Sequence, residues 1–201
     1  MASDTEPSLP DPFDAEKLAL RDRARLARNA IAPEIRRSAA ERVAERGLSD
    51  IAARPGIVGG YHPTAKEFDC LPLLARLERE GWAVTLPVIT GEAPLLFRRW
   101  RPGDPLRKGQ RAILEPVSGE ILRPGLLLVP LLAFDAGGAR LGYGGGHYDR
   151  TLEALRRDGP VLAIGLAFEA QEMAQLPVSP HDQRLDLILT PSGVRRFDQQ
   201  L

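Results

Sequence analysis

The segment from Gly125 to Phe134, GLLLVPLLAF, restricts the fold more than any other stretch, because it contains no charged or hydroxyl side chain. A strand with one face in water alternates apolar and polar residues, whereas a strand of a parallel sheet is covered on both faces and is apolar throughout. The segment therefore predicts a buried strand in a sheet that carries helices on each side. Parallel strands need crossover connections, so helices should alternate with strands.

The other segments follow this alternation. A helix is expected from about Lys17, where KLALRDRARLARNAI is rich in strong helix formers, and a second from Pro33 to the stop at Gly47. Further helices are expected over 70–81 and 148–159, and strands over 56–62, 82–89, 94–100, 161–168 and 186–190. The sequence predicts an α/β fold: a single three-layer domain, with a mostly parallel or mixed sheet and helices on both faces.

Chain length and local composition set the expected domain organisation. The 201 residues suffice for one domain with a real core. Residues 1–16, MASDTEPSLPDPFDAE, are acidic and proline-rich, so we expect a flexible N-terminal tail followed by a single domain over 17–201. The proline- and glycine-rich stretch 101–119 is expected to be a long surface connection with a short strand near Ile113.

Charge and cysteine content argue against several classes of function. The 27 basic and 27 acidic residues balance, so the basic excess of a protein that coats nucleic acid is missing. No apolar run approaches the roughly 20 residues of a membrane span. The single cysteine, Cys70, excludes an internal disulfide and fits a reducing cytosol. We therefore expect a cytoplasmic protein, a monomer or weak homodimer, with neither nucleic acid nor membrane as partner.

Residues 140–150, RLGYGGGHYDR, form the most distinctive motif and hold four of the nineteen glycines. The motif follows the buried strand and precedes a helix, and phosphate groups bind where a strand ends and a helix begins. Arg140 and Arg150 add positive charge. The motif fits neither G-x-x-x-x-G-K-[ST] nor G-x-G-x-x-G. It indicates a nucleotide-phosphate loop, and a tight turn that needs glycine is the alternative.

The stretch LLAFDAGGARLGYGGGHYDR resembles the signature of the 5-formyltetrahydrofolate cyclo-ligase family, also called 5,10-methenyltetrahydrofolate synthetase. KLALR, GGYHPTAKEFDCLPLL, PLLFRRW, AILEP and SPHDQRLDLILTP resemble other family segments in order and spacing, over roughly residues 17–191. His147 stands where the family usually has tyrosine. The resemblance implies conversion of 5-formyltetrahydrofolate to 5,10-methenyltetrahydrofolate with ATP and magnesium. The formyl oxygen is phosphorylated, N10 attacks, and ADP and phosphate are released.

The resemblance also implies site residues. It places ATP on Lys17, Arg21, Arg140, Leu141, Gly142, Tyr143, Gly144, Gly145, Gly146, His147, Tyr148 and Asp149. Catalytic charge stabilisation is expected from Lys17, Arg140 and Arg150. The reduced folate would contact Tyr61, His62, Glu67 and Trp100, and magnesium would bind Asp149 and Asp186.

The residue types alone leave simpler interpretations open. Lys17 and Arg21 could lie on a solvated helix face, and Glu67 could be an acid at a helix N-terminus. Asp149 could be an N-cap, which is compatible with metal binding. Trp100 could be a core residue.

Other functions also stay open at this stage. A sugar-phosphate isomerase or a CoA transferase would want a catalytic glutamate near the glycine loop, and the nearest, Glu153, lies inside the following helix. A non-catalytic nucleotide or folate sensor would not need the carboxylates of Asp149 and Asp186. The histidines His62, His147 and His181 lack metal-ligand spacing, so no zinc site is expected.

Overall fold

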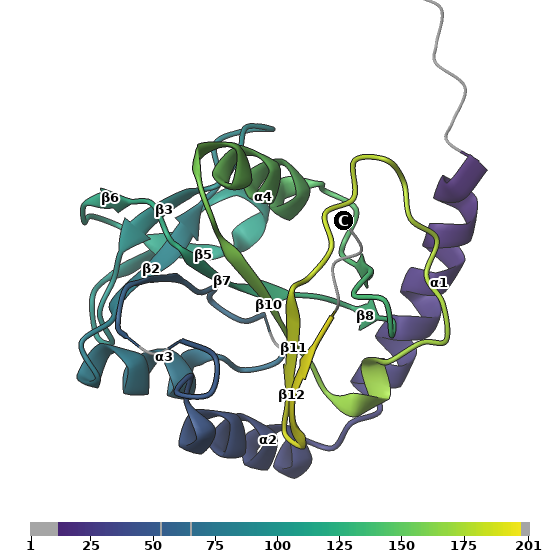
Figure 1. Cartoon of the computed structure of the whole chain (residues 1–201), viewed down its shortest axis with the longest axis horizontal. Coiled ribbons are helices and arrows are strands. Elements are labelled where there is room, and N and C mark those ends of the chain that lie inside the picture. Colours follow the sequence, from purple (N-terminus) through teal and green to yellow (C-terminus); the bar gives the residue numbers. More distant parts are fainter. Residues whose placement is uncertain (1–11, 53, 65, 198–201) are drawn as a thin grey trace, which may run out of the picture.

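An eight-stranded sheet runs through the centre of the molecule in the order β12-β11-β10-β7-β1-β2-β3-β6 (Figure 1). The structure is a computed structural model that describes residues 12–52, 54–64 and 66–197. The central strands all run parallel: β11 (Leu187–Thr190), β10 (Leu162–Leu166), β7 (Leu126–Pro130), β1 (Ile57–Gly59) and β2 (Ala83–Val88). The predicted α/β fold with a mostly parallel or mixed sheet is confirmed.

Strand β7 shows why its sequence is apolar throughout. Leu126 and Leu128 pack into one core, together with residues of α2 (Pro33–Arg46) and α3 (Leu71–Arg79). Leu127 and Val129 pack into a second core with α4 (His147–Asp158). Successive side chains of a strand point to opposite faces, so a strand between two helical layers needs apolar residues at every position.

The two βαβ crossovers place helices on opposite faces of the sheet. The chain passes from β1 through α3 to β2 on one side, and from β7 through α4 to β10 on the other. Right-handed crossovers that advance in opposite directions put their helices on opposite faces. The strand order therefore reverses between β1 and β7, and ligands of open α/β sheets bind at the carboxyl ends of strands beside such a reversal.

Helix α1 (Pro12–Asn29) packs beside the sheet (Figure 1). Its Ala24 belongs to a third core with residues around the hairpin of β8 (Ala133–Phe134) and β9 (Arg140–Leu141). The helix begins at Pro12, within the stretch 1–16 that we expect to be a tail, and proline is well suited to a first helical turn. Residues 1–11 lie outside the described part of the chain.

The sheet ends on both sides in antiparallel strands. β3 (Leu96–Arg99) pairs with β2, and β6 (Ile121–Leu122) pairs with β3. On the other side β12 (Gly193–Arg196) pairs with β11, although 186–190 was expected to be the last strand.

The stretch 101–119 contains a hairpin of β4 (Leu106–Lys108) and β5 (Leu114–Pro116) rather than a bare connection with one strand near Ile113. Arg107 and the buried Glu115 hold this hairpin together with an ion pair of 2.9 Å. A short 3₁₀ turn occupies Glu169–Gln171, and Gln110–Ala112 forms a tight turn whose backbone at Arg111 is not that of a regular helix. Across the described residues, no helix combines the length and hydrophobicity that a bilayer crossing requires.

Candidate functional site

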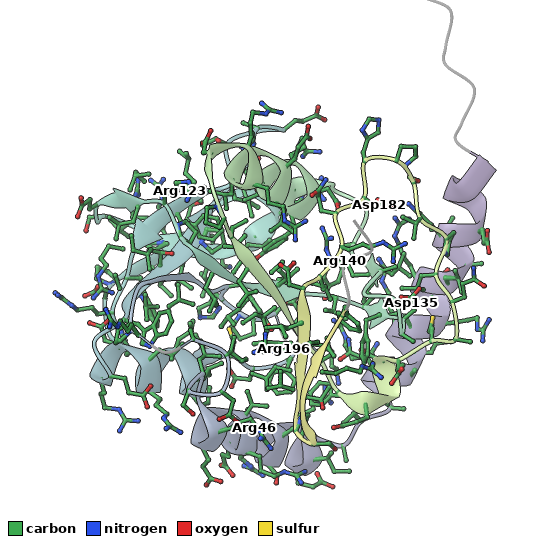
Figure 2. The ribbon with its side chains drawn as sticks, in the orientation of Figure 1. Arg46, Arg123, Asp135, Arg140, Asp182 and Arg196 are labelled. Carbon is green, nitrogen blue, oxygen red and sulfur yellow. The ribbon has the colours of Figure 1, made fainter. Side chains whose placement is uncertain are left out.

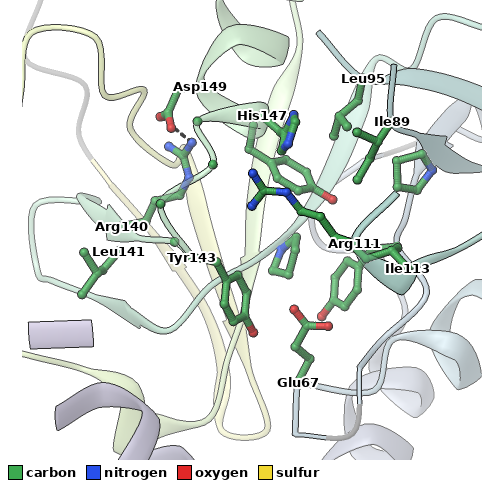
Figure 3. A pocket seen from close by; sticks show the side chains of 18 of the residues that line it. Glu67, Ile89, Leu95, Arg111, Ile113, Arg140, Leu141, Tyr143, His147 and Asp149 are labelled. Carbon is green, nitrogen blue, oxygen red and sulfur yellow. Dashed lines mark hydrogen bonds and ion pairs between the residues drawn. The ribbon is translucent and has the colours of Figure 1, made fainter. Parts of the chain in front are cut away.

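A cavity of about 520 Å³ lies where the carboxyl ends of β1, β2 and β7 meet (Figure 3). Tyr61 and His62 follow β1, Ile89 follows β2, and Pro130 ends β7; all four line the cavity. The glycine loop, defined as residues 142–146, forms another wall. This is the position that the strand order favours for a ligand.

The cavity brings together most of the residues singled out from the sequence. These lining residues are Lys17, Arg21, Tyr61, His62, Glu67, Arg140, Leu141, Gly142, Tyr143, Gly144, Gly145, Gly146, His147, Tyr148 and Asp149. Arg150, Trp100 and Asp186 are not among them. The roles of all these residues in binding or catalysis remain predictions.

Left-handed backbone and the approach of arginine side chains explain glycine at two of the three consecutive positions, Gly144 and Gly146. Gly144 and Gly146 have φ angles of 92° and 63°, which disfavour a residue with a Cβ. A Cβ at Gly146 would lie 2.5 Å from Arg150 Nη1, and one at Gly144 would lie 3.3 Å from Arg21 Cζ. Glycine therefore lets guanidinium groups approach the loop backbone closely.

The same arginines hold the loop in place. Arg21 Nε donates to Gly142 O at 3.1 Å, and Arg150 Nη2 donates to Gly145 O at 2.9 Å. Arg150 therefore supports the loop backbone rather than lining the cavity. The buried Arg28 donates to the hydroxyl of Tyr143, whose ring centroid lies 5.6 Å from Arg28 Cζ.

Asp135 follows β8 and fixes the turn that leads to β9 and the glycine loop. Its carboxylate accepts hydrogen bonds from the backbone N–H groups of Gly137, Ala139 and Leu176, at 2.9, 3.0 and 3.1 Å. Asp135 and Arg140 are labelled in Figure 2. A buried carboxylate that accepts several N–H bonds fixes a turn, and here the turn leads directly into Arg140. Asp135 thereby sets where β9 starts.

Lys17 is buried, with 8% of its surface exposed, so it does not lie on a solvated helix face. Its Nζ donates to Asp182 Oδ2 at 2.6 Å and to Ser179 Oγ at 2.8 Å. Asp182 belongs to the connection that precedes β11 and also accepts from Ser179 N. Lys17, Ser179 and Asp182 all line the cavity, so a carboxylate holds this ammonium group at the cavity wall.

Arg140 and Asp149 form a second cation–carboxylate pair. Arg140 Nη2 donates to Asp149 Oδ1 at 2.6 Å, and Gln183 N donates to the same oxygen at 3.0 Å (Figure 3). Asp149 Oδ2 takes no hydrogen bond from the described residues. Asp149 lies in the first turn of α4, whose N-cap is Gly146, so the N-cap interpretation of Asp149 is wrong.

The structure does not place Asp186 at the cavity as a partner of Asp149. Asp186 Oδ2 accepts from Arg156 Nη2 at 3.1 Å and from Ala163 N at 2.7 Å, so it ties the start of β11 to α4 and β10. In the described part of the chain, no three histidine, cysteine or acidic side chains form a metal-binding group. For magnesium, Asp149 fits as a single carboxylate beside phosphate oxygens, and Asp186 does not fit as the second.

Glu67 lies in the wall that follows β1. Its Oε2 accepts from Thr64 N at 2.6 Å, and the residue precedes α3 rather than standing in its first turn. Burial raises the pKa of Tyr143, and the carboxylate of Glu67 raises it further. Figure 3 shows Glu67 and Tyr143 of the glycine loop on facing sides of the cavity. Trp100 is buried in the core on the α2–α3 side of the sheet, so it provides no wall for a substrate.

Three lining residues carry buried polar atoms without a partner among the described residues. They are Arg140 Nη1, His147 Nε2 and the Tyr148 hydroxyl. Burial lowers the pKa of His147, and the charges of Arg150 and Arg111 lower it further. Burial raises the pKa of Tyr148, so its hydroxyl stays a neutral donor. Unpartnered buried polar groups are costly, and a polar ligand in the cavity would give these three atoms partners.

Nine lining residues were not expected from the sequence. They are Thr64, Pro87, Ile89, Leu95, Arg111, Ile113, Pro130, Ser179 and Asp182. Ser179 and Asp182 belong to the stretch SPHDQRLDLILTP, but no local sequence pattern predicts that this connection contacts α1. Arg111 lies in the stretch that was expected to be a surface connection.

Comparisons with known proteins agree on one family. The profile of the 5-formyltetrahydrofolate cyclo-ligase family matches residues 14–191. The 5-formyltetrahydrofolate cyclo-ligase of Mycolicibacterium smegmatis is 34% identical over 173 residues, covering 78% of this chain and 88% of the relative. The enzyme of the same name from Escherichia coli K12 is 37% identical over 135 residues, covering 64% of this chain and 74% of the relative.

Solved structures show the same fold. The NMR structure of Aquifex aeolicus 5,10-methenyltetrahydrofolate synthetase superposes with a TM-score of 0.74 at 30% identity, covering 92% of this chain and 94% of that one. A 5,10-methenyltetrahydrofolate synthetase from Mycoplasma pneumoniae superposes with a TM-score of 0.70 at 21% identity, covering 88% of this chain and 99% of that one. The second likeness supports the fold alone.

Proposed function

The chain belongs to the 5-formyltetrahydrofolate cyclo-ligase family, and from this membership we propose how its cavity carries out the reaction. It is an enzyme of that class, which converts 5-formyltetrahydrofolate to 5,10-methenyltetrahydrofolate. The proposal is that this conversion consumes ATP, requires magnesium, and releases ADP and phosphate. It also assigns a role to each wall of the cavity.

One observation carries the proposal: the cavity has two chemically different walls that face each other. The wall after β1 presents the carboxylate of Glu67. The opposite wall is the glycine loop, surrounded by Lys17, Arg21 and Arg140. The first wall suits the N–H donors of a pterin, and the second suits an anion such as a triphosphate.

At the folate wall, Glu67 accepts hydrogen bonds from the amino group and a ring N–H of the pterin. His62 and Tyr61 line the same wall. The Tyr61 hydroxyl already donates to Phe68 O at 2.8 Å, so Tyr61 stabilises the wall after β1, and Glu67 is the residue that hydrogen-bonds to the pterin. A carboxylate with two oxygens matches two adjacent N–H donors.

At the nucleotide wall, the glycine loop and the start of α4 bind the triphosphate. Backbone N–H groups at the N-terminus of α4 and the cations Lys17, Arg21 and Arg140 donate to phosphate oxygens. Lys17 and Arg140 are already held by Asp182 and Asp149, so little side-chain entropy is lost when ATP binds. The unpartnered Arg140 Nη1 supplies one donor for a phosphate oxygen.

Asp149 is the residue that would hold magnesium, through Oδ2. The ion offsets negative charge on the phosphate oxygens when it is bound. Arg140 keeps the Asp149 side chain oriented through its bond to Oδ1. The roles of Asp149 and Arg140 are therefore linked, because a change at either residue alters the position of the other.

The chemistry needs activation of a poor leaving group. The formyl oxygen of the substrate attacks the γ-phosphorus, the bond to the β–γ bridging oxygen breaks, and its electron pair leaves with ADP. N10 then attacks the activated carbon, the C–O bond breaks, and phosphate leaves with that electron pair and the N10 proton. The protein positions the two substrates and stabilises charge, and no side chain has to act as general base.

The alternatives lack support at the cavity. A sugar-phosphate isomerase or CoA transferase would need a glutamate beside the glycine loop. Glu153 is exposed on α4 and pairs with Arg157 at 3.2 Å instead.

The test is turnover of 5-formyltetrahydrofolate, followed by the absorbance of the methenyl product. We expect product only when ATP, magnesium and the 5-formyl isomer are present together. Glu67→Gln should raise the KM for the folate at least 10-fold and leave the KM for ATP unchanged, because a donor would then face the donors of the pterin. Equal turnover without a nucleotide, or a Glu67→Gln enzyme with an unchanged folate KM, would contradict the proposal.

A further inference from the structure

The hairpin of β4 and β5 delivers an arginine to the cavity from outside the main sheet. β5 lies against β2, and the loop of residues 109–113 turns back toward the glycine loop. Gly109 N donates to Ile113 O at 2.9 Å and closes the base of this turn. Arg111 and Ile113 line the cavity. Figure 3 shows the Arg111 side chain extending from the side of Ile113 across the cavity toward the glycine loop.

The backbone of this turn is strained. Arg111 and Ala112 have φ angles of 56° and 58°, and they are the described residues other than glycine with positive φ. Left-handed backbone is disfavoured for any residue with a Cβ, and such strain gathers at functional sites, where the surroundings impose it. The conformation here directs Arg111 into the cavity. A Cβ at Gly145 would lie 3.1 Å from Arg111 Nη1, so the guanidinium reaches the glycine loop itself.

Arg111 differs from the other cations around the glycine loop. Lys17 and Arg140 have carboxylate partners, and Arg21 and Arg150 donate to loop carbonyls. Arg111 makes neither an ion pair nor a hydrogen bond with the residues that the structure describes. It stands in the same neighbourhood as Arg150 and His147. A guanidinium without a counterion, beside other cations, is stabilised when an anion binds.

We propose that Arg111 is a catalytic residue whose guanidinium contacts the phosphoryl group as it passes from ATP to the formyl oxygen. The inference rests on the proposed function, in which Glu67 binds the pterin and the glycine loop binds the triphosphate. Figure 3 shows the Arg111 guanidinium reaching the glycine loop from the side of Ile113, and the transfer would take place beside this group.

In this step the γ-phosphorus loses the bridging oxygen to ADP and gains the formyl oxygen, while its other three oxygens stay attached. Negative charge concentrates on these three oxygens during the transfer. The planar fork of an arginine donates to two of them at once, which a single ammonium group cannot do. Arg111 is therefore expected to bind the transferring group more strongly than either substrate.

The test compares Arg111→Ala and Arg111→Lys with Lys108→Ala, a variant of an exposed cation on the same hairpin. We measure kcat, both KM values, and the Kd of a non-hydrolysable ATP analogue. Arg111→Ala should lower kcat about 100-fold, the size of effect found when one donor to a developing anion is removed. The Kd of the analogue and the folate KM should change less than about 3-fold, Arg111→Lys should recover only part of kcat, and Lys108→Ala should be normal.

Three other results for the Arg111 variants would contradict the proposal, and each would assign Arg111 a different role. A raised Kd for the analogue with normal kcat would make Arg111 a nucleotide-binding residue. A raised folate KM alone would assign it to a carboxylate of the substrate. Normal kinetics of Arg111→Ala would remove it from the site. Failure of the proposed function is distinct, because the wild-type enzyme itself would then form no product.

Discussion

The cavity is bounded by two loops that both contain left-handed backbone. They differ in the residues that adopt it and in whether the neighbouring cations have partners. The glycine loop adopts it at Gly144 and Gly146, where no Cβ resists, and its surrounding cations are anchored. The turn of residues 109–113 adopts it at Arg111 and Ala112, where a Cβ does resist, and its cation is free of protein partners in the described chain. In our proposal the glycine loop binds the triphosphate of ATP in the ground state, and Arg111 of the second loop contacts the phosphoryl group during its transfer.

Gly146→Ala should produce the largest effect, because it removes the freedom that the glycine loop depends on. At a φ of 63° the new Cβ costs about 1–2 kcal/mol of stability. The Cβ also meets Arg150 Nη1 at 2.5 Å, so the Arg150 guanidinium, whose Nη2 donates to Gly145 O, has to shift. Displacement of the loop should lower kcat/KM about 100-fold.

Gly81→Ala is the matched control for this prediction. Gly81 has a φ of 90° after α3, and a Cβ there meets nothing within 4 Å. It should lose similar stability in urea unfolding and keep normal kinetics. Equal kinetic losses in both variants would show that strain alone, rather than loop position, governs activity.

Lys17→Ala tests whether Lys17, which is paired with Asp182, acts differently from Arg111, which has no ion-pair partner among the described residues. Loss of a charge-assisted bond to phosphate costs about 1.5–3 kcal/mol, so the KM for ATP should rise about 10- to 100-fold. The kcat at saturating ATP should fall much less than in Arg111→Ala. Arg23→Ala, on the exposed face of the same helix, is the control. A Lys17→Ala enzyme with a normal KM for ATP and a reduced kcat would show that Lys17 and Arg111 have the same role.

Asp149→Asn and Asp186→Asn separate the carboxylate at the cavity from the one outside it. Asp149→Asn should lower the rate about 10-fold, with partial rescue at high magnesium, because a hard cation loses a charged ligand. Asp186→Asn should cost about 0.5–1 kcal/mol of stability through its pair with Arg156 and leave the magnesium dependence intact. In the double variant, the loss of rate should equal that of Asp149→Asn, and the losses of stability should add, because the two residues do not share a partner. Non-additive losses in rate would restore the shared ion that the sequence suggested.

Ala112→Gly should give the smallest effect, with the opposite sign from Gly146→Ala. Glycine relieves left-handed strain of about 1–2 kcal/mol but loses about 0.5–1 kcal/mol of backbone entropy on folding. The net expectation is a stabilisation of about 0.5–1 kcal/mol, measured as a higher urea midpoint. Destabilisation would mean that residue 112 is not strained, and the contrast between the two loops would disappear.

These two loops also show what could be predicted from the sequence. Consecutive glycines signal unusual backbone and close approach, so the glycine loop was recognised from its letters. Arg111 and Ala112 carry no such signal, because neither residue type favours left-handed backbone. Long-range packing likewise decides that Trp100 enters the core and that Asp186 meets Arg156 rather than Asp149. Local periodicity predicted the helices and the parallel strands well, but the edge strand β12 and the β4–β5 hairpin follow from tertiary pairing.

The antiparallel strands at the two edges of the sheet bear on how the chain avoids self-association while it folds. Parallel sheets form slowly, because their contacts join distant parts of the chain, and an unpaired edge can recruit another molecule meanwhile. One edge here ends in β6, which is only Ile121–Leu122, and the other in β12, where Arg195 and Arg196 are exposed. Short or charged edge strands resist cross-chain pairing. Once these edges have formed, neither of them offers a long uncharged strand on which another chain could aggregate.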